Sequence, residues 1–537
     1  MSRLPDPIRE GLQRGWKVLG GAHAELPKQI TCDVAIIGSG AGAGITAELL
    51  TRAGLRVVLV EEGPLKSSTD FHQKESEAYP ALYQESAARK TEDKSISILQ
   101  GRCVGGSTTV NWASSFRTPD STLSLWQQAF GLVEFTSEAL QPYFEQAERR
   151  LGVAPWPMPA NENNAILRRG ADRLGIGVGT IPRNVRGCWN LGSCGLGCPT
   201  NAKQSMLVTT IPTALDHGAI LLVETRAQRL ETSKGQVQAV HCVAVRANGE
   251  MLGDSQCTLV ASHIVLAGGA INSPAVLLRS EAADPYGVLG QRTFLHPIVS
   301  SAAVFKQRVE GWSGAPQSVY SDHYLEPENR ADGIGFKLEV PSLHPVVLAT
   351  TLPGHGSTYA DLMRRFPHLH AMAALMKDGF HEEASGGRVK LRSDGSPVLD
   401  YPITPYILNG ARRALLAMAE LQFAAGAHLV LPIHEQAREL VDWTGARRAI
   451  QNLDMRPHLT KILSAHVMGG CGMSADESLG VTRPDGVHWQ IENLSIHDGS
   501  LFPTSIGANP QLSIYAMVNR LAQGLAKRMT GQAVTLA

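Results

Sequence analysis

A short apolar strand that runs directly into a cluster of glycines is the feature that most constrains the fold of this chain. Residues 32–37, CDVAII, have the β-branched and apolar character of a strand buried on both faces. Glycines occupy alternate positions from 38 to 44, and residues 45–53 then have helical periodicity. A second apolar run, VVLV at 57–60, follows. The pattern predicts a β-turn-α-turn-β unit, the opening unit of a doubly wound α/β fold.

The glycine cluster matches the dinucleotide fingerprint G-x-G-x-x-G/A at Gly38, Ser39, Gly40, Gly42 and Ala43. Gly38 permits the tight turn, Gly40 lets a pyrophosphate approach the backbone, and the following helix points its N–H groups at the phosphates. The second strand ends at Glu61, 23 residues after Gly38 and followed by Gly63, where a carboxylate can accept hydrogen bonds from an adenosine ribose. A glycine-rich surface turn is the alternative, but the flanking elements favour dinucleotide binding. The motif alone does not separate FAD from NAD.

Composition narrows the classes of protein that this chain can represent. Of its 537 residues, 43% are hydrophobic, enough for one or two buried cores, which excludes a mainly disordered chain. Lysine plus arginine equals aspartate plus glutamate, 49 each, so nucleic acid is not indicated as a partner. Eight cysteines are too few for a disulfide scaffold and fit a reducing compartment or a cofactor site.

The pattern of charges argues against membrane-spanning and secretion segments. Charged residues are dispersed through residues 1–15, without the apolar core of a signal peptide. The most lipid-like stretch, residues 414–431, contains Glu420, Gln422 and His428, and we interpret it as one buried or amphipathic helix. We expect no transmembrane segment and a location in the cytoplasm or at the inner face of a membrane. Peripheral membrane association, and export with a partner subunit, stay open.

Further motifs lie along the chain, and together they carry a resemblance. GRCVGGSTTVN spans residues 101–111, and GGAINSP at 268–274 follows a predicted strand, with Ser273 as helix N-cap and Pro274 as first helical residue. HVMGGCGM (466–473) and NLSIHDGSLFPTSIGANPQ (493–511) form a C-terminal pair. With the first glycine cluster, they resemble the glucose-methanol-choline (GMC) oxidoreductases, FAD-dependent enzymes acting mostly on alcohols. The resemblance is closest to long-chain alcohol oxidase and dehydrogenase-like members.

The resemblance implies an α/β and α+β fold, in which a Rossmann-like FAD-binding domain is interleaved with a substrate domain built on a mixed sheet with helices. We expect residues 30–160, 200–300 and 455–537 to form the FAD-binding domain, and residues 160–200 and 300–455 to form the substrate-binding domain. The resemblance also implies further cofactor-binding residues: Arg102, Gly105, Gly106, Ser107, Asn111, Ala227, Asp498, Gly499, Pro510 and Gln511.

Alcohol oxidation by a flavin needs a base for the hydroxyl proton and a hydride acceptor, flavin N5. His466 matches the family's base, and Asn509 matches its second catalytic position, which is His or Asn. The resemblance implies that His466 accepts the proton while the Asn509 amide orients the incipient alkoxide. By itself, one of 18 histidines is more often structural, and an asparagine here could simply hold the flavin.

Two features of the sequence bear on how the flavin is held. Residues 510–529 predict a helix; if its N-terminus faces the flavin, its dipole stabilises the reduced anion by about 1 kcal/mol, and an ordinary packing helix is the alternative. Some family members attach FAD covalently through a histidine just before the asparagine of the 101–111 motif. That position is Val110 here, so we expect non-covalent FAD that acid or heat releases.

Three of the eight cysteines, Cys188, Cys194 and Cys198, lie within eleven residues. Their spacing resembles the iron-sulfur stretch of cluster-bearing sugar dehydrogenase subunits of the same family, and soft thiolate ligands suit such clusters. The residues between them look more like long-chain alcohol oxidase relatives, for which no cluster is implied. We therefore predict no metal, with a compact loop or local disulfide favoured and an iron-sulfur cluster as the alternative.

The sequence thus predicts FAD-dependent oxidation of a small-molecule alcohol, by proton abstraction and hydride transfer to flavin N5. A hydrophobic or long-chain alcohol is favoured, and sugars and sterols stay open. No motif indicates whether O2, a quinone or a cytochrome accepts the electrons, and so oxidase and dehydrogenase are not separated. The alternatives are an iron-sulfur sugar or polyol dehydrogenase subunit serving a cytochrome, and a non-catalytic flavoprotein. The sequence contains no HExxH, P-loop or GxSxG motif, which removes three hydrolase classes.

Overall fold

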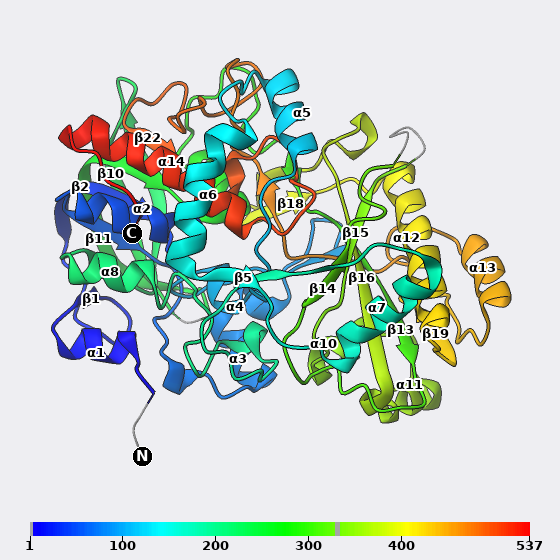
Figure 1. The fold of residues 1–537 in the computed structure, drawn as a ribbon. Helices are drawn as coiled ribbons and strands as arrows, with labels where there is room; N and C mark the ends of the chain where they lie inside the picture. Colours follow the sequence, from blue (N-terminus) through cyan, green and yellow to red (C-terminus); the bar gives the residue numbers. More distant parts are fainter. Residues whose placement is uncertain (1–3, 247, 328–332, 537) are drawn as a thin grey trace.

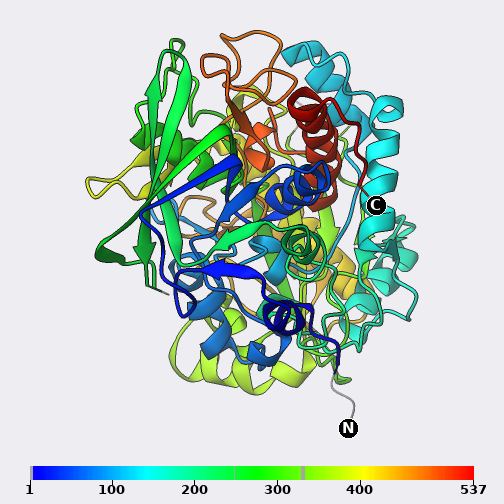
Figure 2. The same cartoon turned by 90° about the vertical axis from the view of Figure 1, so that its left-hand side faces the viewer.

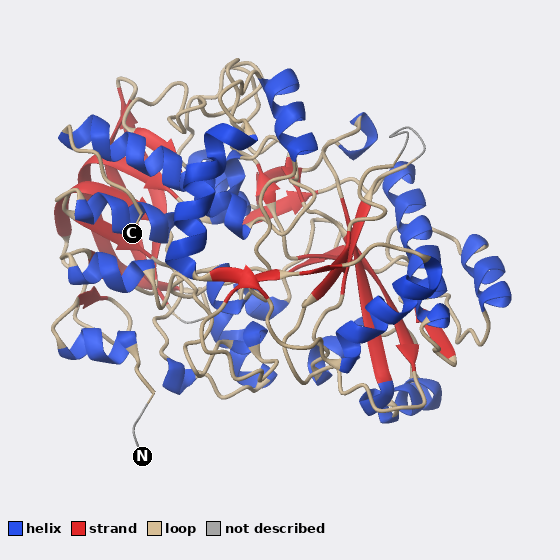
Figure 3. Ribbon diagram, in the orientation of Figure 1, coloured by secondary structure: helices blue, strands red, loops and turns tan. Residues whose placement is uncertain are grey.

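The computed structural model describes residues 4–246, 248–327 and 333–536, which form two mixed sheets side by side, each covered by helices (Figure 1, Figure 3). The first sheet has the order β1-β8-β3-β2-β11-β10-β9, and β22 also pairs with β11. Its parallel part comprises β1 (Lys17–Leu19), β8 (Ile220–Leu222), β3 (Val57–Val60), β2 (Gln29–Ile37), β11 (Met251–Leu266) and β22 (Leu494–Ile496). The strands β9 (Thr225–Ser233) and β10 (Gln236–Val245) extend it in antiparallel fashion.

The predicted β-turn-α-turn-β unit is present as β2, α2 (Ala41–Arg52) and β3. All four residues of β3 and the last four of β2 are buried, as expected for central parallel strands covered on both faces. The helix α14 (Gln511–Thr530) packs beside α2 across one face of this sheet (Figure 2). Its apolar stripe, including Leu512, Tyr515 and Val518, is buried, so the helix predicted over 510–529 is confirmed.

The second sheet has the order β4-β20-β13-β16-β15-β14-β6, and β19 also pairs with β13. Helix α12 (Pro405–Ala424) packs on this sheet, and the apolar residues of the helix share one core with those of β13, β15 and β16. The strands are β4 (Ile96–Ile98), β20 (Ile462–Ser464), β13 (Ile298–Val304), β16 (Leu369–Met376), β15 (Phe336–Glu339), β14 (Val319–Ser321), β6 (Gly179–Thr180) and β19 (Leu429–Pro432).

The remaining elements connect the sheets or cover them. The other helices are α1 (Pro7–Gln13), α3 (Glu75–Leu82), α4 (Ser107–Val110), α5 (Asp120–Phe130), α6 (Ser137–Leu151), α7 (Glu162–Leu174), α8 (Thr210–Asp216), α9 (Gly269–Arg279), α10 (Pro345–Thr351), α11 (Gly356–Arg364), α12 (Pro405–Ala424) and α13 (Trp443–Gln451). Two-stranded ribbons are formed by β12 (Thr293–Phe294) with β21 (Met468–Gly469), β17 (Arg388–Leu391) with β18 (Pro397–Asp400), and β5 (Val153–Pro155) with β7 (Pro182–Asn184).

The buried helix predicted over residues 414–431 is present as far as residue 424, but its continuation to residue 431 is wrong. Helix α12 ends at Ala424, and the chain turns through Gly426, whose φ of +97° disfavours any other residue, into strand β19. Among the described residues, no helix combines the length and apolar character needed to cross a bilayer. The predicted fold class is confirmed, and the sequence borders of the two domains stay a prediction.

Candidate functional site

A cavity of about 640 Å³ is lined by residues from both sheets. It brings together the glycine cluster after β2 and the C-terminal residues His466 and Asn509, which are more than 400 positions away in the sequence. The predicted residues that line it are Gly38, Ser39, Gly40, Gly42, Glu61, Arg102, Gly106, Ser107, Asn111, Ala227, His466, Asp498, Gly499, Asn509, Pro510 and Gln511.

Three predicted residues, Ala43, Gly63 and Gly105, do not line the cavity. Ala43 is fully buried in α2, and Gly63 packs against the Arg102 main chain, where a Cβ would lie only 2.3 Å from a carbonyl oxygen. The Gly105 N–H donates to Ser39 Oγ at 3.0 Å. These residues therefore support the cavity wall from behind.

Close backbone approach explains why glycine is required in the two glycine loops. A Cβ on Gly106 would lie 2.9 Å from Gly40 Cα, so the 101–107 loop rests directly on the first loop. A Cβ on Gly42 would lie 1.7 Å from the carbonyl oxygen of His497, which brings the C-terminal motif against the start of α2. The three motifs are thus in contact only because side chains are absent at these positions.

Glu61 is held by its own loop. Its carboxylate accepts hydrogen bonds from Ser39 Oγ at 2.5 Å and from the Gly63 N–H at 2.7 Å. Burial raises the pKa of Glu61 to about 7, against the opposing effect of these two donors. The carboxyl group therefore has a fixed orientation in the cavity wall.

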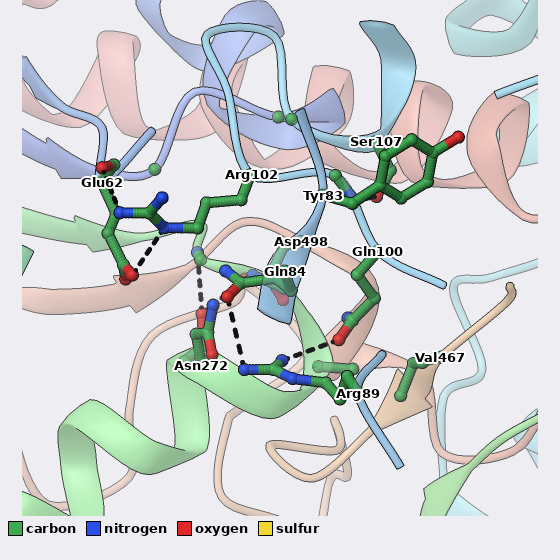
Figure 4. Close-up of a pocket in the computed structure, with 18 of the residues that line it drawn as sticks. Glu62, Tyr83, Gln84, Arg89, Gln100, Arg102, Ser107, Asn272, Val467 and Asp498 are labelled. Atoms are coloured by element: carbon green, nitrogen blue, oxygen red, sulfur yellow. Dashed lines mark hydrogen bonds and ion pairs between the residues drawn. The ribbon is translucent and has the colours of Figure 1, made fainter. Parts of the chain in front are cut away.

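The next residue, Glu62, is a site residue that the sequence prediction missed. Its carboxylate Oε1 lies 2.9 Å from both Arg102 Nε and Arg226 Nη2, and Figure 4 shows the Arg102 contact. Burial alone would raise the pKa of Glu62, but the two guanidinium groups outweigh it and lower the pKa to about 2. The sequence did offer a signal for Glu62, since it is the second acidic residue of the VVLVEEG run. A carboxylate at the end of such a strand can contact residues of neighbouring loops.

Other missed residues form a polar network on the cavity wall. Arg89 donates to Gln100 at 2.9 Å, and Gln84 Oε1 lies 3.5 Å from the same guanidinium group. Figure 4 shows both contacts. Arg89 is buried, and Glu85, its ion-pair partner, is partly exposed. No motif marks these residues, since they lie in a polar segment without periodicity.

The predicted start of the helix after residue 267 is wrong. Helix α9 begins at Gly269, with Gly268 as N-cap, so Ser273 and Pro274 lie inside it. Ser273 Oγ donates to the Asp498 carboxylate at 2.6 Å, and the same Oδ2 atom accepts the Gly269 N–H at 2.8 Å. Pro274 is the sixth residue of α9, so the helix lacks the main-chain N–H that would bond to the carbonyl four residues earlier. Ser273 Oγ also accepts the N–H of Gly268 at 2.9 Å, so the serine links the C-terminal motif to the start of its own helix.

His466 follows β20 and lies beside His296, which the sequence prediction missed. Their Nδ1 atoms are 3.1 Å apart, so one ring donates and the other accepts. Burial lowers the pKa of His466 to about 4, and burial with the neighbouring charges of His466, Lys337 and Lys377 holds the pKa of His296 well below its usual range. Both imidazoles are therefore neutral at pH 7.

His296 is locked in place from its main chain. Its N–H and that of Leu295 donate to the buried Asp378 carboxylate at 3.0 and 2.9 Å. Its φ of +49° is a strained conformation for a non-glycine residue, which the surroundings enforce. Its Nε2 atom has no hydrogen-bond partner among the described residues. In the sequence, the only signal for His296 is its place directly before Pro297.

Asn509 contacts Glu339, at the end of β15. Asn509 Nδ2 donates to Glu339 Oε2 at 3.1 Å. Within the described chain, neither Asn509 Oδ1 nor Glu339 Oε1 has a hydrogen-bond partner. Burial raises the pKa of Glu339 to about 7 against the opposing charge of Lys337. The carboxyl group thus determines which way the Asn509 amide points.

The start of α14 also faces the cavity. Pro510 and Gln511 line it, and no side chain caps the first N–H groups of this helix. Gln511 Oε1 accepts from Asn111 Nδ2 at 2.7 Å, joining the helix to the 101–111 loop. Val110, at the end of α4, also lines the cavity and offers no atom for a covalent bond to a flavin.

These residues fit FAD as a bound cofactor. The first N–H groups of α2, like those of α14, have no side-chain cap and can receive phosphate or an anionic ring. The glycine loops leave space beside the backbone. On the side of the cavity formed by the C-terminal motifs, the buried Asn509 Oδ1 has no hydrogen-bond partner within the described chain.

The three cysteines of residues 188–198 are not arranged as a metal-binding group in the described structure. Among the described residues, no group of three His, Cys, Asp or Glu side chains is arranged to hold a metal ion. Cys188, Cys194 and Cys198 are free thiols, so the local disulfide is also absent. The loop is compact, with a short 3-10 turn at Cys194–Leu196.

Comparisons with known proteins agree with this description. Family models described as GMC oxidoreductase match residues 79–298 and 383–517. The chain is 31% identical over 518 residues to an uncharacterized GMC-type oxidoreductase of Mycobacterium tuberculosis, covering 95% of this chain and 78% of that protein. It is 27% identical over 545 residues to a long-chain-alcohol oxidase of Arabidopsis thaliana, covering 96% of this chain and 70% of the relative.

Solved structures share the fold at low sequence identity. Pyridoxine 4-oxidase from Mesorbium loti has a TM-score of 0.66 at 17% identity, over 92% of this chain and 99% of that chain. A variant of formate oxidase from Aspergillus oryzae has a TM-score of 0.68 at 14% identity, over 94% of this chain and 99% of that chain.

Proposed function

Because this chain belongs to the GMC oxidoreductase family, a class of FAD-dependent enzymes, we propose that it oxidises a hydrophobic alcohol to the corresponding carbonyl compound, with His466 as the base. The observation that carries the proposal is the meeting of His466 and Asn509 with the dinucleotide motif in one cavity. FAD, when bound there, supplies the acceptor for the hydride of the alcohol carbon.

The tautomer of the histidine pair decides whether His466 can act as a base. If His466 Nδ1–H donates to His296 Nδ1, then His466 Nε2 carries the lone pair that takes the hydroxyl proton. The ring keeps its donated hydrogen bond after it is protonated, so His296 serves as acceptor in both states. Because the pKa of His296 is held low, it does not compete for the proton.

Asn509 is proposed to orient the substrate oxygen. One N–H of its amide donates to Glu339, and its Oδ1 has no hydrogen-bond partner among the described residues. The predicted cofactor contacts are proposals of the same kind: Glu61 for the ribose, the α2 start for the pyrophosphate, and the α14 start for the flavin ring.

The substrate class rests on similarity and on the cavity wall. The Arabidopsis relative is named a long-chain-alcohol oxidase. Near His466 the cavity is lined by Ile298, Leu463 and Val467, whose apolar side chains suit an alkyl chain. O2 is the electron acceptor favoured by the names of the oxidase relatives, and FAD is proposed to be non-covalent because Val110 offers no attachment point.

An anaerobic chain-length series tests this function. The holoprotein is mixed with primary alcohols of increasing length, and with a sugar and a sterol, while the flavin absorbance is followed. We expect bleaching that accelerates with chain length, followed in air by reoxidation and hydrogen peroxide. Bleaching by the sugar alone would reassign the substrate, and a flavin that no alcohol reduces would make the protein a non-catalytic flavoprotein. Acid precipitation should leave the flavin in the supernatant.

A further inference from the structure

Outside the cavity, the loop of residues 188–198 holds three cysteines beside two buried cations. Cys188, Cys194 and Cys198 are half-buried, whereas the other five cysteines are buried. The side chains of Arg183 and Lys203 are almost inaccessible, at 1% and 2%. The polar partners described for them are main-chain carbonyls and the sulfur of Cys194, and Arg183 Nε has none in the described chain.

Two buried cations without a carboxylate among these described partners need another source of negative charge. Arg183 Nη2 lies 3.7 Å from Cys194 Sγ, and Cys198 Sγ lies 3.4 Å from Thr200 Oγ1. Burial would raise the pKa of Cys198, but hydrogen bonds from Thr200 and from the main chain, with the Lys203 charge, lower it. Burial instead raises the pKa of Cys103 to about 12. Cys198 is therefore the cysteine best prepared to react.

Lys203 connects this loop to the wall of the cavity. Its Nζ donates to three carbonyl oxygens, those of Cys194 at 2.8 Å, Thr109 at 2.6 Å and Asn111 at 2.9 Å. Three acceptors use all three protons of an ammonium group, which favours the charged form of Lys203, whereas burial lowers its pKa to about 8. Tyr83, which lines the cavity, also donates to the Gly195 carbonyl at 2.6 Å. A movement of the thiol loop must therefore move residues 109–111.

We propose that Cys198 is an oxidative modification site that reacts with hydrogen peroxide and forms a disulfide with Cys194. In the first step, the thiolate sulfur bonds to one peroxide oxygen, the O–O bond breaks, and hydroxide leaves, which gives a sulfenic acid. In the second step, the Cys194 sulfur bonds to the Cys198 sulfur, the S–O bond breaks, and water leaves with the Cys194 proton. The two electrons lost by the sulfurs reduce the peroxide.

The disulfide is expected to displace the Cys194 carbonyl from Lys203 and to loosen the 109–111 segment. FAD would then be held less firmly, and a reductant would reverse the change. The substrate identity does not enter this argument, so the proposal survives a wrong assignment of the alcohol.

Peroxide treatment of the FAD-bound protein tests the proposal. A sulfenic acid trap, dimedone, is added, and labelled peptides are identified by mass spectrometry. We expect label on Cys198, a Cys194–Cys198 disulfide when dimedone is omitted, and persistent sulfenic acid in Cys194→Ser. In the unmodified protein, iodoacetamide should label Cys198 roughly tenfold or more faster than Cys103, a comparison that needs no variant. Released FAD fluorescence should rise on oxidation and fall again with dithiothreitol.

The control is Cys188→Ser, which removes the third thiol of the same loop and should leave both labelling and disulfide formation unchanged. The proposal is overturned if dimedone labels another cysteine first, if iodoacetamide does not favour Cys198, or if the disulfide forms without affecting FAD retention. Stoichiometric iron or zinc in the purified protein, lost in Cys198→Ser, would also overturn it.

Discussion

Around the glycine loops the buried charges are paired, whereas around His466 several buried polar atoms have no partner within the described chain. Glu62 is neutralised by Arg102 and Arg226, and Glu61 accepts two hydrogen bonds. In the other region, unpartnered atoms are found on His296, Glu339 and Asn509 among the described residues. Buried groups occur in both regions, so burial does not explain the difference.

The difference teaches how one cavity divides binding from chemistry. The ion pairs of Glu62 with Arg102 and Arg226 keep that carboxylate ionised, with a pKa of about 2, and a fixed set of charges suits the binding of a cofactor. In the His466 region, the neutral imidazoles can take up a proton, and the Asn509 amide has an acceptor atom, Oδ1, for a hydrogen bond to a substrate. A substitution in the first region should therefore alter cofactor affinity, and one in the second should alter the rate of flavin reduction.

The largest expected effect is that of His466→Ala. Removal of the proposed base should slow flavin reduction by alcohol by about 10²- to 10⁴-fold, since a positioned base contributes this much. FAD should stay bound, because no charge pair of the glycine-loop region is touched. Anaerobic stopped-flow absorbance measures the rate, and the exposed His217→Ala is the matched control. Near-normal reduction by the variant would remove His466 from the mechanism.

His296→Ala should have a smaller effect on the same rate, roughly 10- to 100-fold, because it removes the acceptor that selects the His466 tautomer. Its distinguishing readout is the pH profile. In the unchanged protein, His466 is protonated only as the pH falls through its pKa of about 4, so reduction should persist down to about pH 5. In the variant, water reaches His466 and its pKa should rise toward the ordinary value of histidine. As the pH is lowered, activity should therefore be lost at a higher pH than in the unchanged protein. An unchanged profile would make His296 merely structural.

Glu62→Ala should weaken FAD binding by roughly tenfold, since it leaves Arg102 and Arg226 close together without their shared carboxylate. At saturating FAD, the rate of flavin reduction should stay within about twofold of the unchanged protein, because this group does not contact His466 or Asn509. Isothermal titration of the apoprotein measures the affinity. Glu134→Ala, which breaks an ion pair on the surface, is the control.

The two regions also differ in how far the sequence predicts them. The glycine loops can be predicted from the sequence because close backbone contact, as between Gly40 and Gly106, requires glycine at fixed positions of a motif. Glu62, His296 and Glu339 act through partners distant in sequence, so no local pattern marks them. The same limit explains the misplaced start of α9, since Ser273 lies inside the helix and its hydroxyl donates to Asp498, 225 positions away. The borders of the two domains stay predictions for the same reason.

The smallest effect is expected for Glu339→Gln, and it tests the state of the Asn509 amide. A carboxylate can only accept from Asn509 Nδ2, whereas a protonated carboxyl can also donate to Oδ1 and let the amide turn over. Because the pKa of Glu339 is raised to about 7, the group is protonated below pH 7 and ionised above it. Flavin reduction should therefore show an inflection near pH 7, of about fivefold if one hydrogen bond of about 1 kcal/mol is exchanged.

The variant Glu339→Gln should lack this inflection, because the introduced amide neither ionises nor changes its donors with pH. Its rate should match the low-pH plateau of the unchanged protein, since the introduced amide can donate to Asn509 Oδ1 as the protonated acid does. The surface Glu310→Gln, which carries the same chemical change next to Arg308, should keep the inflection. If Glu339→Gln also keeps the inflection, the group that titrates near pH 7 is not Glu339. The hydrogen bonding of the Asn509 amide then does not depend on the ionisation of Glu339. In that case the contrast between the two regions would rest on the histidine pair alone.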